Sequence, residues 1–161
     1  YLTDDSIREN IAFGVAKEDI DDERVWHVLE EAQLKDFVKE LPGMLDMEIG
    51  ERGVRLSGGQ RQRLTIARAL VKKPRVLILD DSASALDYAT DAALRKAIRQ
   101  MEGAPTVFIV SQRTSSLMSA DRILVLDDGE ATGYGTHEEL LKNCQTYREI
   151  YNSQYGKKEE A

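Results

Sequence analysis

Cysteine, histidine and long apolar runs are scarce in this sequence. Its 161 residues include one cysteine, Cys144, and two histidines, so an internal disulfide and a Cys/His metal cage are both excluded. The longest aliphatic runs have four or five residues, as at 76–79, whereas a helix that crosses a bilayer needs about 20 apolar residues. There is no signal-peptide pattern and the first residue is Tyr1, so we expect an internal cut at that point.

Basic residues are in the minority. Lys and Arg total 22 against 29 Asp and Glu, which gives a formal net charge of −7. The acidic excess lies in residues 1–50, which hold 14 acidic and 5 basic residues. A basic footprint for nucleic acid is therefore missing from the first third and weak in the rest, and we expect no direct nucleic-acid partner. The composition, 42% hydrophobic and 32% charged, is that of a soluble globular domain.

Helical signals come first along the chain. Ser6 and Glu9 fit a capping box, and apolar residues then recur at helical spacing until Pro42 and Gly43. Strands are predicted at 75–80, 106–111 and 122–127, with a helix at 88–101 and further helices from Thr136 onward. Continuous apolar strands that alternate with helices favour an α/β fold with a parallel sheet covered on both faces.

Two adjacent carboxylates, Asp80 and Asp81, follow the first predicted strand. Ligands bind at the carboxyl edge of such sheets, and a carboxylate buried there without a partner costs roughly several kcal/mol, which a cation offsets. In P-loop NTPases an acid at this place holds Mg²⁺ and a following residue orients the attacking water. The alternative is that both acids are solvated or cap the next turn.

A glycine pair lies at the start of the helix predicted to run to about Lys73. In the segment Leu56, Ser57, Gly58, Gly59 and Gln60, the glycines let a phosphate approach the free N–H groups of the helix start. Ser57 and Gln60 also form a capping-box pattern on their own. A cap needs no glycines, which cost about 1 kcal/mol each in a helical turn, so the pair indicates a further reason.

Together these motifs resemble the ATP-binding-cassette (ABC) ATPase family. Residues 56–60 with the following RQRLTIARAL match its signature, and 75–81 look like its Walker B motif. Residues 84–87 are similar to its D-loop, and Gln112 falls in its switch loop. Segments 6–14, 48–53 and 135–140 resemble exporter-type members, so the resemblance covers nearly the whole chain.

The resemblance implies a fold and its division. We expect the second part of a RecA-like P-loop NTPase core together with the α-helical subdomain of the family. Residues 1–74 would form the helical subdomain with the signature motif and its helix. Residues 75–135 would form the core strands with Walker B, D-loop and switch loop, and 136–161 the C-terminal helices and a frayed tail.

Several family features are missing or altered. The Walker A pattern GxxxxGK[ST] and the Q-loop glutamine do not occur, so we expect this segment alone to bind ATP weakly or not at all. Asp81 stands where active members have Glu, and Gln112 where they have His. The shorter carboxylate retreats by about 1.5 Å, and a misplacement of about 1 Å can cost on the order of 10²-fold in rate. Both changes predict a degenerate catalytic site.

The intact signature implies a role in trans. In the family, each ATP lies between one domain's Walker A and the other's signature, so Leu56 to Gln60 would close over the partner's ATP. Asp87 is either a D-loop contact across that dimer or a helix cap. Asp80 would hold Mg²⁺, with Asp81 and Gln112 serving this chain's own slow site. An asymmetric heterodimer follows, with a slow homodimer as the alternative.

The resemblance therefore implies an ATPase subunit that powers export across a membrane. Its partners would be a second nucleotide-binding domain and a transmembrane domain, and its place the cytoplasmic face of a membrane. Two alternatives stay open: a non-hydrolysing module that binds ATP to hold a dimer closed, and a soluble ABC ATPase that acts on nucleic acid or ribosomes. The second would call for a basic surface or inserted arms, which the sequence lacks.

Overall fold

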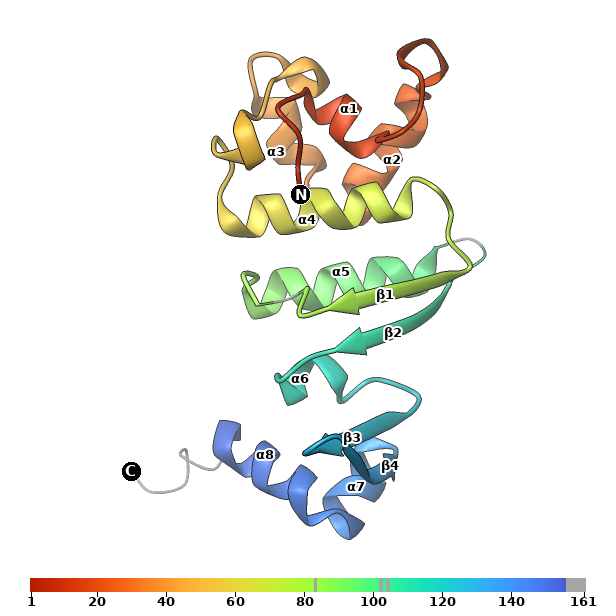
Figure 1. The fold of residues 1–161 in the computed structure, drawn as a ribbon, viewed down its shortest axis with the longest axis vertical. Coiled ribbons are helices and arrows are strands. Elements are labelled where there is room, and N and C mark those ends of the chain that lie inside the picture. The colour runs from red at the N-terminus through yellow and green to blue at the C-terminus, as the bar shows by residue number, and fades with distance from the viewer. Residues whose placement is uncertain (83, 102, 104, 156–161) are drawn as a thin grey trace. The chain divides into compact units, whose positions relative to one another are not determined.

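The chain folds into two compact units, Tyr1–Phe108 and Ile109–Ala161, in a computed structural model that describes residues 1–82, 84–101, 103 and 105–155. Figure 1 traces the elements in chain order. No helix within those ranges is long and apolar enough to span a membrane. The frayed tail expected at the C-terminus lies outside the described residues. The three-part division drawn from the sequence stays a prediction.

The first unit begins with a helical part. It contains α1 (Ile7–Ile11), α2 (Asp22–Glu31), α3 (Lys35–Glu40) and α4 (Gly58–Leu70), with 3-10 turns at Lys17–Asp19, Met44–Asp46 and Glu51–Gly53. The capping box of Ser6 and Glu9 is present at the start of α1, as predicted. The helical spacing that runs through residues 25–41 is broken between α2 and α3, because Gln33 takes a left-handed conformation with φ of 59°.

Asn10 is the polar centre of this helical part and is fully buried. Its Oδ1 accepts hydrogen bonds from the Thr3 N–H at 3.0 Å and the Arg68 Nη2 at 2.6 Å. Its Nδ2 donates to the carbonyls of Thr3 and Ser6, at 3.1 and 3.0 Å. One amide thus joins the N-terminal segment to α1 and, through Arg68, to α4, against which α1 packs.

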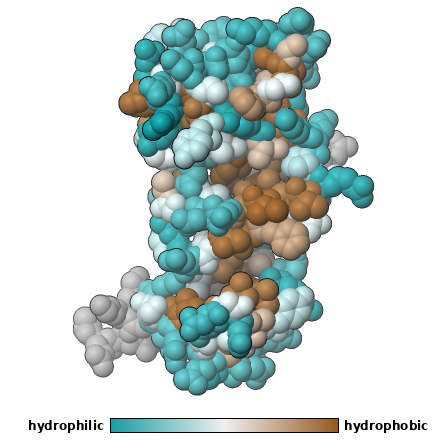
Figure 2. Space-filling model, viewed as in Figure 1, coloured by the Kyte–Doolittle hydropathy of each residue, from teal (hydrophilic) through white to brown (hydrophobic). Residues whose placement is uncertain are grey.

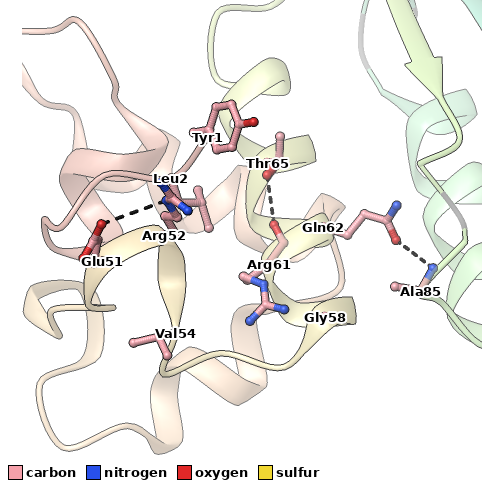
Figure 3. A pocket seen from close by; sticks show the side chains of 10 residues that line it. All are labelled: Tyr1, Leu2, Glu51, Arg52, Val54, Gly58, Arg61, Gln62, Thr65 and Ala85. Carbon is pink, nitrogen blue, oxygen red and sulfur yellow. Dashed lines mark hydrogen bonds and ion pairs between the residues drawn. The ribbon is translucent and has the colours of Figure 1, made fainter.

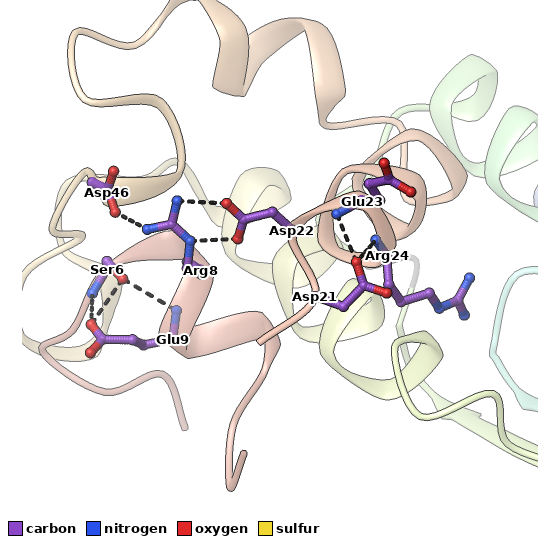
Figure 4. A network of polar contacts seen from close by, with 8 residues as sticks. All are labelled: Ser6, Arg8, Glu9, Asp21, Asp22, Glu23, Arg24 and Asp46. Carbon is purple, nitrogen blue, oxygen red and sulfur yellow. Dashed lines mark hydrogen bonds and ion pairs between the residues drawn. The ribbon is translucent and has the colours of Figure 1, made fainter. Parts of the chain in front are cut away.

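A second polar network fixes the acidic side of the helical part (Figure 4). Arg8 on α1 donates from Nε and Nη2 to the two carboxylate oxygens of Asp22, at 2.7 and 3.0 Å, and from Nη1 to Asp46. These carboxylates raise the pKa of the Arg8 guanidinium. Asp21 caps α2 by accepting the N–H bonds of Glu23 and Arg24. One arginine therefore holds the start of α2 and the 44–46 turn against α1.

The first unit continues into the α/β part. β1 (Val76–Asp80) leads through a loop to α5 (Tyr88–Gln100) and then β2 (Thr106–Val110), whose last two residues fall beyond the unit boundary at Phe108. The two strands form a sheet in which they point the same way (Figure 1). The Thr106 N–H donates to the Arg75 carbonyl at 3.0 Å. The predicted α/β fold with a parallel sheet is confirmed.

The sheet is covered on one face, not on both as expected. Leu77 and Leu79 are buried, whereas Val76 and Ile78 on the opposite face are 54% and 68% exposed. Apolar surface gathers over these strands in Figure 2. Among the described residues, those that contact this face leave more than half of Val76 and Ile78 exposed. Side chains along β1 therefore point alternately into the apolar core and toward the more exposed face.

The second unit contains α6 (Thr114–Leu117), the hairpin β3 (Ile123–Asp127) and β4 (Glu130–Gly135), and the helices α7 (His137–Asn143) and α8 (Gln145–Tyr155). Its core is a cluster of Ile123, Val125, Leu140, Cys144 and Tyr147. The apolar pattern predicts no strand at 130–135, although the turn Asp128-Gly129 is a hairpin signal. Both turn residues have positive φ, 46° and 83°, as a type I′ turn requires.

Replacement of Asn10 tests the first polar network. Asn10→Ala removes the side-chain acceptor of the Arg68 guanidinium and the Thr3 N–H in a part-buried place, which costs about 2 kcal/mol of unfolding free energy. Urea denaturation of the chain measures it, with Glu40→Ala, at an exposed site on α3, as a control expected to stay within about 0.5 kcal/mol. Equal stability of the two variants would contradict a structural role for Asn10.

Candidate functional site

The signature segment forms the N-terminus of α4. Ser57 is the N-cap: its Oγ accepts the Gln60 N–H at 3.2 Å, and the Gln60 Oε1 accepts the Ser57 N–H at 2.7 Å. Leu56 is buried beneath the turn. The predicted capping box is therefore present. Because the Ser57 Oγ only accepts a hydrogen bond in it, the hydroxyl proton of Ser57 remains able to donate. Exposed N–H groups at a helix start also favour an anion.

Gly58 and Gly59 have different surroundings. A Cβ added to Gly59 would lie 3.0 Å from the carbonyl oxygen of Ala85 and 3.5 Å from Leu86 Cδ2. A Cβ added to Gly58 would meet the Ala85 Cβ at 3.7 Å, an ordinary van der Waals contact. The close approach of the loop after β1 therefore accounts for Gly59 within this chain. It does not account for Gly58, where a methyl group fits.

The two acids lie at the carboxyl end of β1, as predicted: Asp80 is its last residue and Asp81 follows it. Both are exposed, which agrees with the alternative of solvated acids, and their role as cation and water ligands stays a prediction. Asp80 falls on the strand face that carries Val76 and Ile78, because side chains alternate along a strand and that face is uncovered. Asp81 has a left-handed φ of 45°. Such a conformation costs about 1–3 kcal/mol in a residue other than glycine and persists only where surrounding bonds hold it.

Gln62 supplies such bonds, although no sequence motif selects it as a functional residue. From α4, its Nε2 donates to the Asp81 carbonyl at 2.9 Å, and its Oε1 accepts the Ala85 N–H at 3.1 Å. Figure 3 shows the second of these bonds. The only available signal was position: Gln62 lies four residues after Gly58, and residues at that spacing share one helix face.

An open cavity of about 670 Å³ adjoins the same helix face. Figure 3 shows its lining from α4, from the N-terminal segment and from the 51–54 turn, including Gly58, Arg61, Tyr1, Arg52 and Ala85. The Arg61 Nη1 donates to the Leu56 carbonyl at 2.7 Å, which ties the base of the signature turn to α4. The cavity therefore places the signature turn, the 51–54 turn and the loop after β1 around one space.

Asp87 caps α5, which confirms one of the two roles expected for it. Its Oδ1 accepts the Thr90 N–H at 2.9 Å, and its Oδ2 accepts the Thr90 hydroxyl at 2.8 Å. These bonds to Thr90 lower the pKa of the Asp87 carboxyl. Its charge also acts on Arg63 of α4, where it partly opposes the lowering of the Arg63 pKa by burial. The D-loop role across a dimer is compatible with the cap, because each carboxylate oxygen has further lone pairs.

Gln112 lies in the second unit and is exposed. Its carbonyl accepts a bond from the Gln154 Nε2 at 2.7 Å, and the Gln154 Oε1 accepts the Thr114 N–H at 3.0 Å. A glutamine from α8 thus holds residues 112–114 by both ends of its amide. Within the first unit, the signature glycines approach Ala85, Gln62 of α4 bonds the Asp81 carbonyl, and the charge of Asp87 acts on Arg63 of α4. Gln112 belongs to the second unit, and its bond with Gln154 lies within that unit.

The acidic side chains are better suited to a metal ion that a substrate also coordinates than to one coordinated by protein ligands alone. Among the described residues, no group of three or more His, Cys, Asp or Glu side chains is placed to hold a metal ion. Mg²⁺ commonly takes one or two carboxylates and completes its shell with water and substrate phosphates. The exposed Asp80 carboxylate meets that requirement as a single hard ligand.

A family model described as ABC transporter matches residues 2–84. Among curated proteins, the chain is 46% identical over 152 residues to the uncharacterized ABC transporter ATP-binding protein YfiB of Bacillus subtilis, covering 94% of this chain and 26% of YfiB. It is 42% identical over 160 residues to the ATP-dependent lipid A-core flippase of Photobacterium profundum, covering 97% of this chain and 26% of the flippase.

A solved structure resembles the fold closely. The chain matches a bacterial Atm1-family ABC exporter with ATP bound at a TM-score of 0.89 and 37% identity, covering 96% of this chain and 27% of that chain. The chain thus spans about a quarter of the length of the relatives it matches. The likeness includes the helical part and the α/β part of the structure, since nearly the whole chain is covered.

The two signature glycines differ in what an alanine would do to folding. Gly58→Ala is expected to keep or raise stability, by up to about 1 kcal/mol, because alanine favours the helix and its methyl has room. Gly59→Ala is expected to be the less stable variant, because its methyl presses on the Ala85 carbonyl. Denaturant unfolding of the two variants compares them directly. A more stable Gly59→Ala would show that the loop after β1 moves away at no cost.

Proposed function

The chain belongs to the ABC transporter family, and on that premise we propose that it is the signature-bearing part of a nucleotide-binding domain that hydrolyses ATP to drive export. The observation that carries the proposal is the start of α4. A capped helix N-terminus with room at Gly58 faces the same loop that carries Asp81. The phosphate-binding Walker A loop would come from another segment, so these residues alone would not turn ATP over.

The chain's own catalytic groups would be Asp80, Asp81 and Gln112. Mg²⁺, when bound, neutralises phosphate charge, and the Asp80 carboxylate would be its protein ligand. The Asp81 carboxylate would orient the attacking water, and the Gln112 amide would donate a hydrogen bond to the γ-phosphate. An amide does not titrate near neutral pH and carries no charge, so it stabilises the leaving charge less than a protonated histidine does. This site would be the slow one.

The signature would act on the ATP of a partner domain. Ser57 would donate its hydroxyl proton to a phosphate oxygen, and the free N–H groups at the start of α4 would add their dipoles. Gly58 would allow the phosphate to approach the backbone. A slow own site beside an intact signature favours a heterodimer whose partner supplies Glu and His to the faster site. A homodimer with two slow sites is the competing assembly.

The domain would be coupled to a transmembrane partner on the cytoplasmic side of a membrane. Proteins named as ATP-binding/permease proteins are among the relatives, including a probable multidrug resistance transporter of Bacillus subtilis, and the ATP-bound exporter shares the fold. A second candidate function is favoured by two residues. Asp81 and Gln112 also suit a module that binds ATP and holds the dimer closed without hydrolysis.

Restoring the consensus residues separates a slow site from an ordinary one. In the complete protein with its partner, Asp81→Glu with Gln112→His is expected to raise the ATPase rate at least tenfold at this chain's site, because carboxylate and imidazole then reach the water and the γ-phosphate. The partner's consensus Glu is replaced by Gln so that its site is silent. If the unaltered chain already hydrolyses ATP as fast as the restored variant, the degenerate site and the non-hydrolysing regulatory module are both contradicted.

The role in trans is tested at Gly58, whose replacement is expected to leave the fold intact. Gly58→Ala should lower the ATPase rate of the mixed dimer at least tenfold, because the methyl group occupies the space through which the partner's phosphate approaches. The matched control is the equivalent Gly→Ala in the partner's signature, which closes over the slow site and should cost much less. Equal losses from both variants would point to a symmetric dimer, and no loss from Gly58→Ala would remove the trans role.

A further inference from the structure

We propose that Gln62 is a positioning residue that transmits the position of the signature helix to Asp81. It is distinct from the catalytic candidates, because its side chain contacts backbone groups of the loop after β1 and not a reacting atom. The inference rests on the proposed function, since it assigns Gln62 a part in the ATPase reaction. Its geometry, however, can be tested without ATP.

Both ends of the Gln62 amide are used. Nε2 donates to the Asp81 carbonyl at 2.9 Å and lies 3.5 Å from the Ser84 Oγ, while Oε1 accepts the Ala85 N–H at 3.1 Å. The carboxamide thus spans the loop from residue 81 to residue 85. A single bond would let the loop rotate about it, whereas two bonds at opposite ends of a planar group fix the loop's orientation relative to α4.

The bond to Asp81 falls on its backbone carbonyl, whose orientation is set by the ψ angle of Asp81. The Asp81 carbonyl also accepts bonds from the Ser84 Oγ at 3.0 Å and the Ser84 N–H at 3.3 Å. Together the three donors hold the peptide that follows Asp81, while β1 holds the peptide that precedes it, so the left-handed conformation of Asp81, φ 45°, is fixed from both sides. Without the Gln62 donor, one of the bonds that favour this costly conformation is lost.

The other end of the connection is the signature. Gly58 and Gln62 are one helix turn apart on the same face of α4, and both face Ala85. A Cβ added to Gly58 would lie 3.7 Å from the Ala85 Cβ, and the Gln62 Oε1 accepts the Ala85 N–H. One turn of helix moves as a rigid body. A phosphate that binds at the start of α4 and displaces it therefore also displaces Gln62, and Gln62 displaces the loop that carries Asp81.

A purely structural role makes a different prediction. Ser84, Ala85 and Asp81 are exposed, so bonds to this loop compete with water and contribute little to overall stability. A structural residue would therefore change stability slightly and the ATPase rate not at all. A positioning residue changes kcat with little change in KM for ATP, because ATP binding does not use it.

Two substitutions separate the two ends of the amide. Gln62→Glu keeps an oxygen for the Ala85 N–H but replaces the donor to the Asp81 carbonyl with a repelling oxygen. Gln62→Lys keeps a donor for the Asp81 carbonyl and removes the acceptor of the Ala85 N–H. Gln62→Met removes both and keeps the side-chain volume. Gln100→Ala, at an exposed site at the end of α5, is the control for a glutamine outside the clamp.

Hydrogen exchange of the Ala85 amide tests the geometry in the chain itself. Protection is expected in the unaltered chain and in Gln62→Glu, and its loss in Gln62→Lys and Gln62→Met. Equal exchange of this amide in all of these variants overturns the clamp, whatever the ATPase data show.

The ATPase rate is measured in the complete protein with its partner, on the Asp81→Glu background, with the partner's own site silenced. Gln62→Glu and Gln62→Met should lower kcat at least tenfold with KM for ATP within twofold, and Gln62→Lys should retain at least threefold more activity than Gln62→Glu. Gln100→Ala should match the parent. Unchanged rates, or equal losses in Glu and Lys variants, overturn the positioning role alone. An assembly that hydrolyses no ATP before Gln62 is altered overturns the proposed function instead.

Discussion

The contact between the start of α4 and the loop after β1 is the constraint on which the rest of the first unit depends. It exists because Gly59 has no side chain: a methyl group there would lie 3.0 Å from the Ala85 carbonyl oxygen. That approach brings Gln62 within bonding distance of Asp81 and Ala85. It also places the capped helix start and the two strand-end acids on neighbouring segments. A signature motif read as a phosphate loop is therefore also a packing motif.

The parts of this fold that were predictable from sequence are those set by local chemistry. The capping boxes predicted at Ser6 and Ser57 need residues three apart, and both are present. The strands follow from short aliphatic runs. The missed features depend on partners distant in sequence or on a single conformation. β4 forms because it pairs with β3, and the separation of α2 from α3 arises from a left-handed Gln33 that no pattern of apolar residues encodes.

The same reasoning explains what sequence could say about the candidate site. Residue types and spacing select Ser57, Asp80, Asp81 and Asp87 as candidates, because carboxylates at strand ends and hydroxyls at helix starts either cap local structure or bind ligands. Gln62 could not be selected, since a glutamine inside a helix is ordinary until its partners 19 and 23 residues away are known. Sequence identifies groups that do chemistry, whereas groups that orient them are recognised through contacts.

The uncovered face of β1 links the acid at its end to the rest of the protein. Asp80 shares that face with Val76 and Ile78, which are more than half exposed. In solvent, its carboxylate needs no partner. Any segment that covers the apolar residues also removes water from around the carboxylate, and removing water from an unpaired carboxylate costs on the order of several kcal/mol. A cation at the carboxylate would offset that cost. On the proposed role of Asp80 as the Mg²⁺ ligand, covering the sheet and binding the ion would therefore favour each other, because each would lower the free-energy cost of the other.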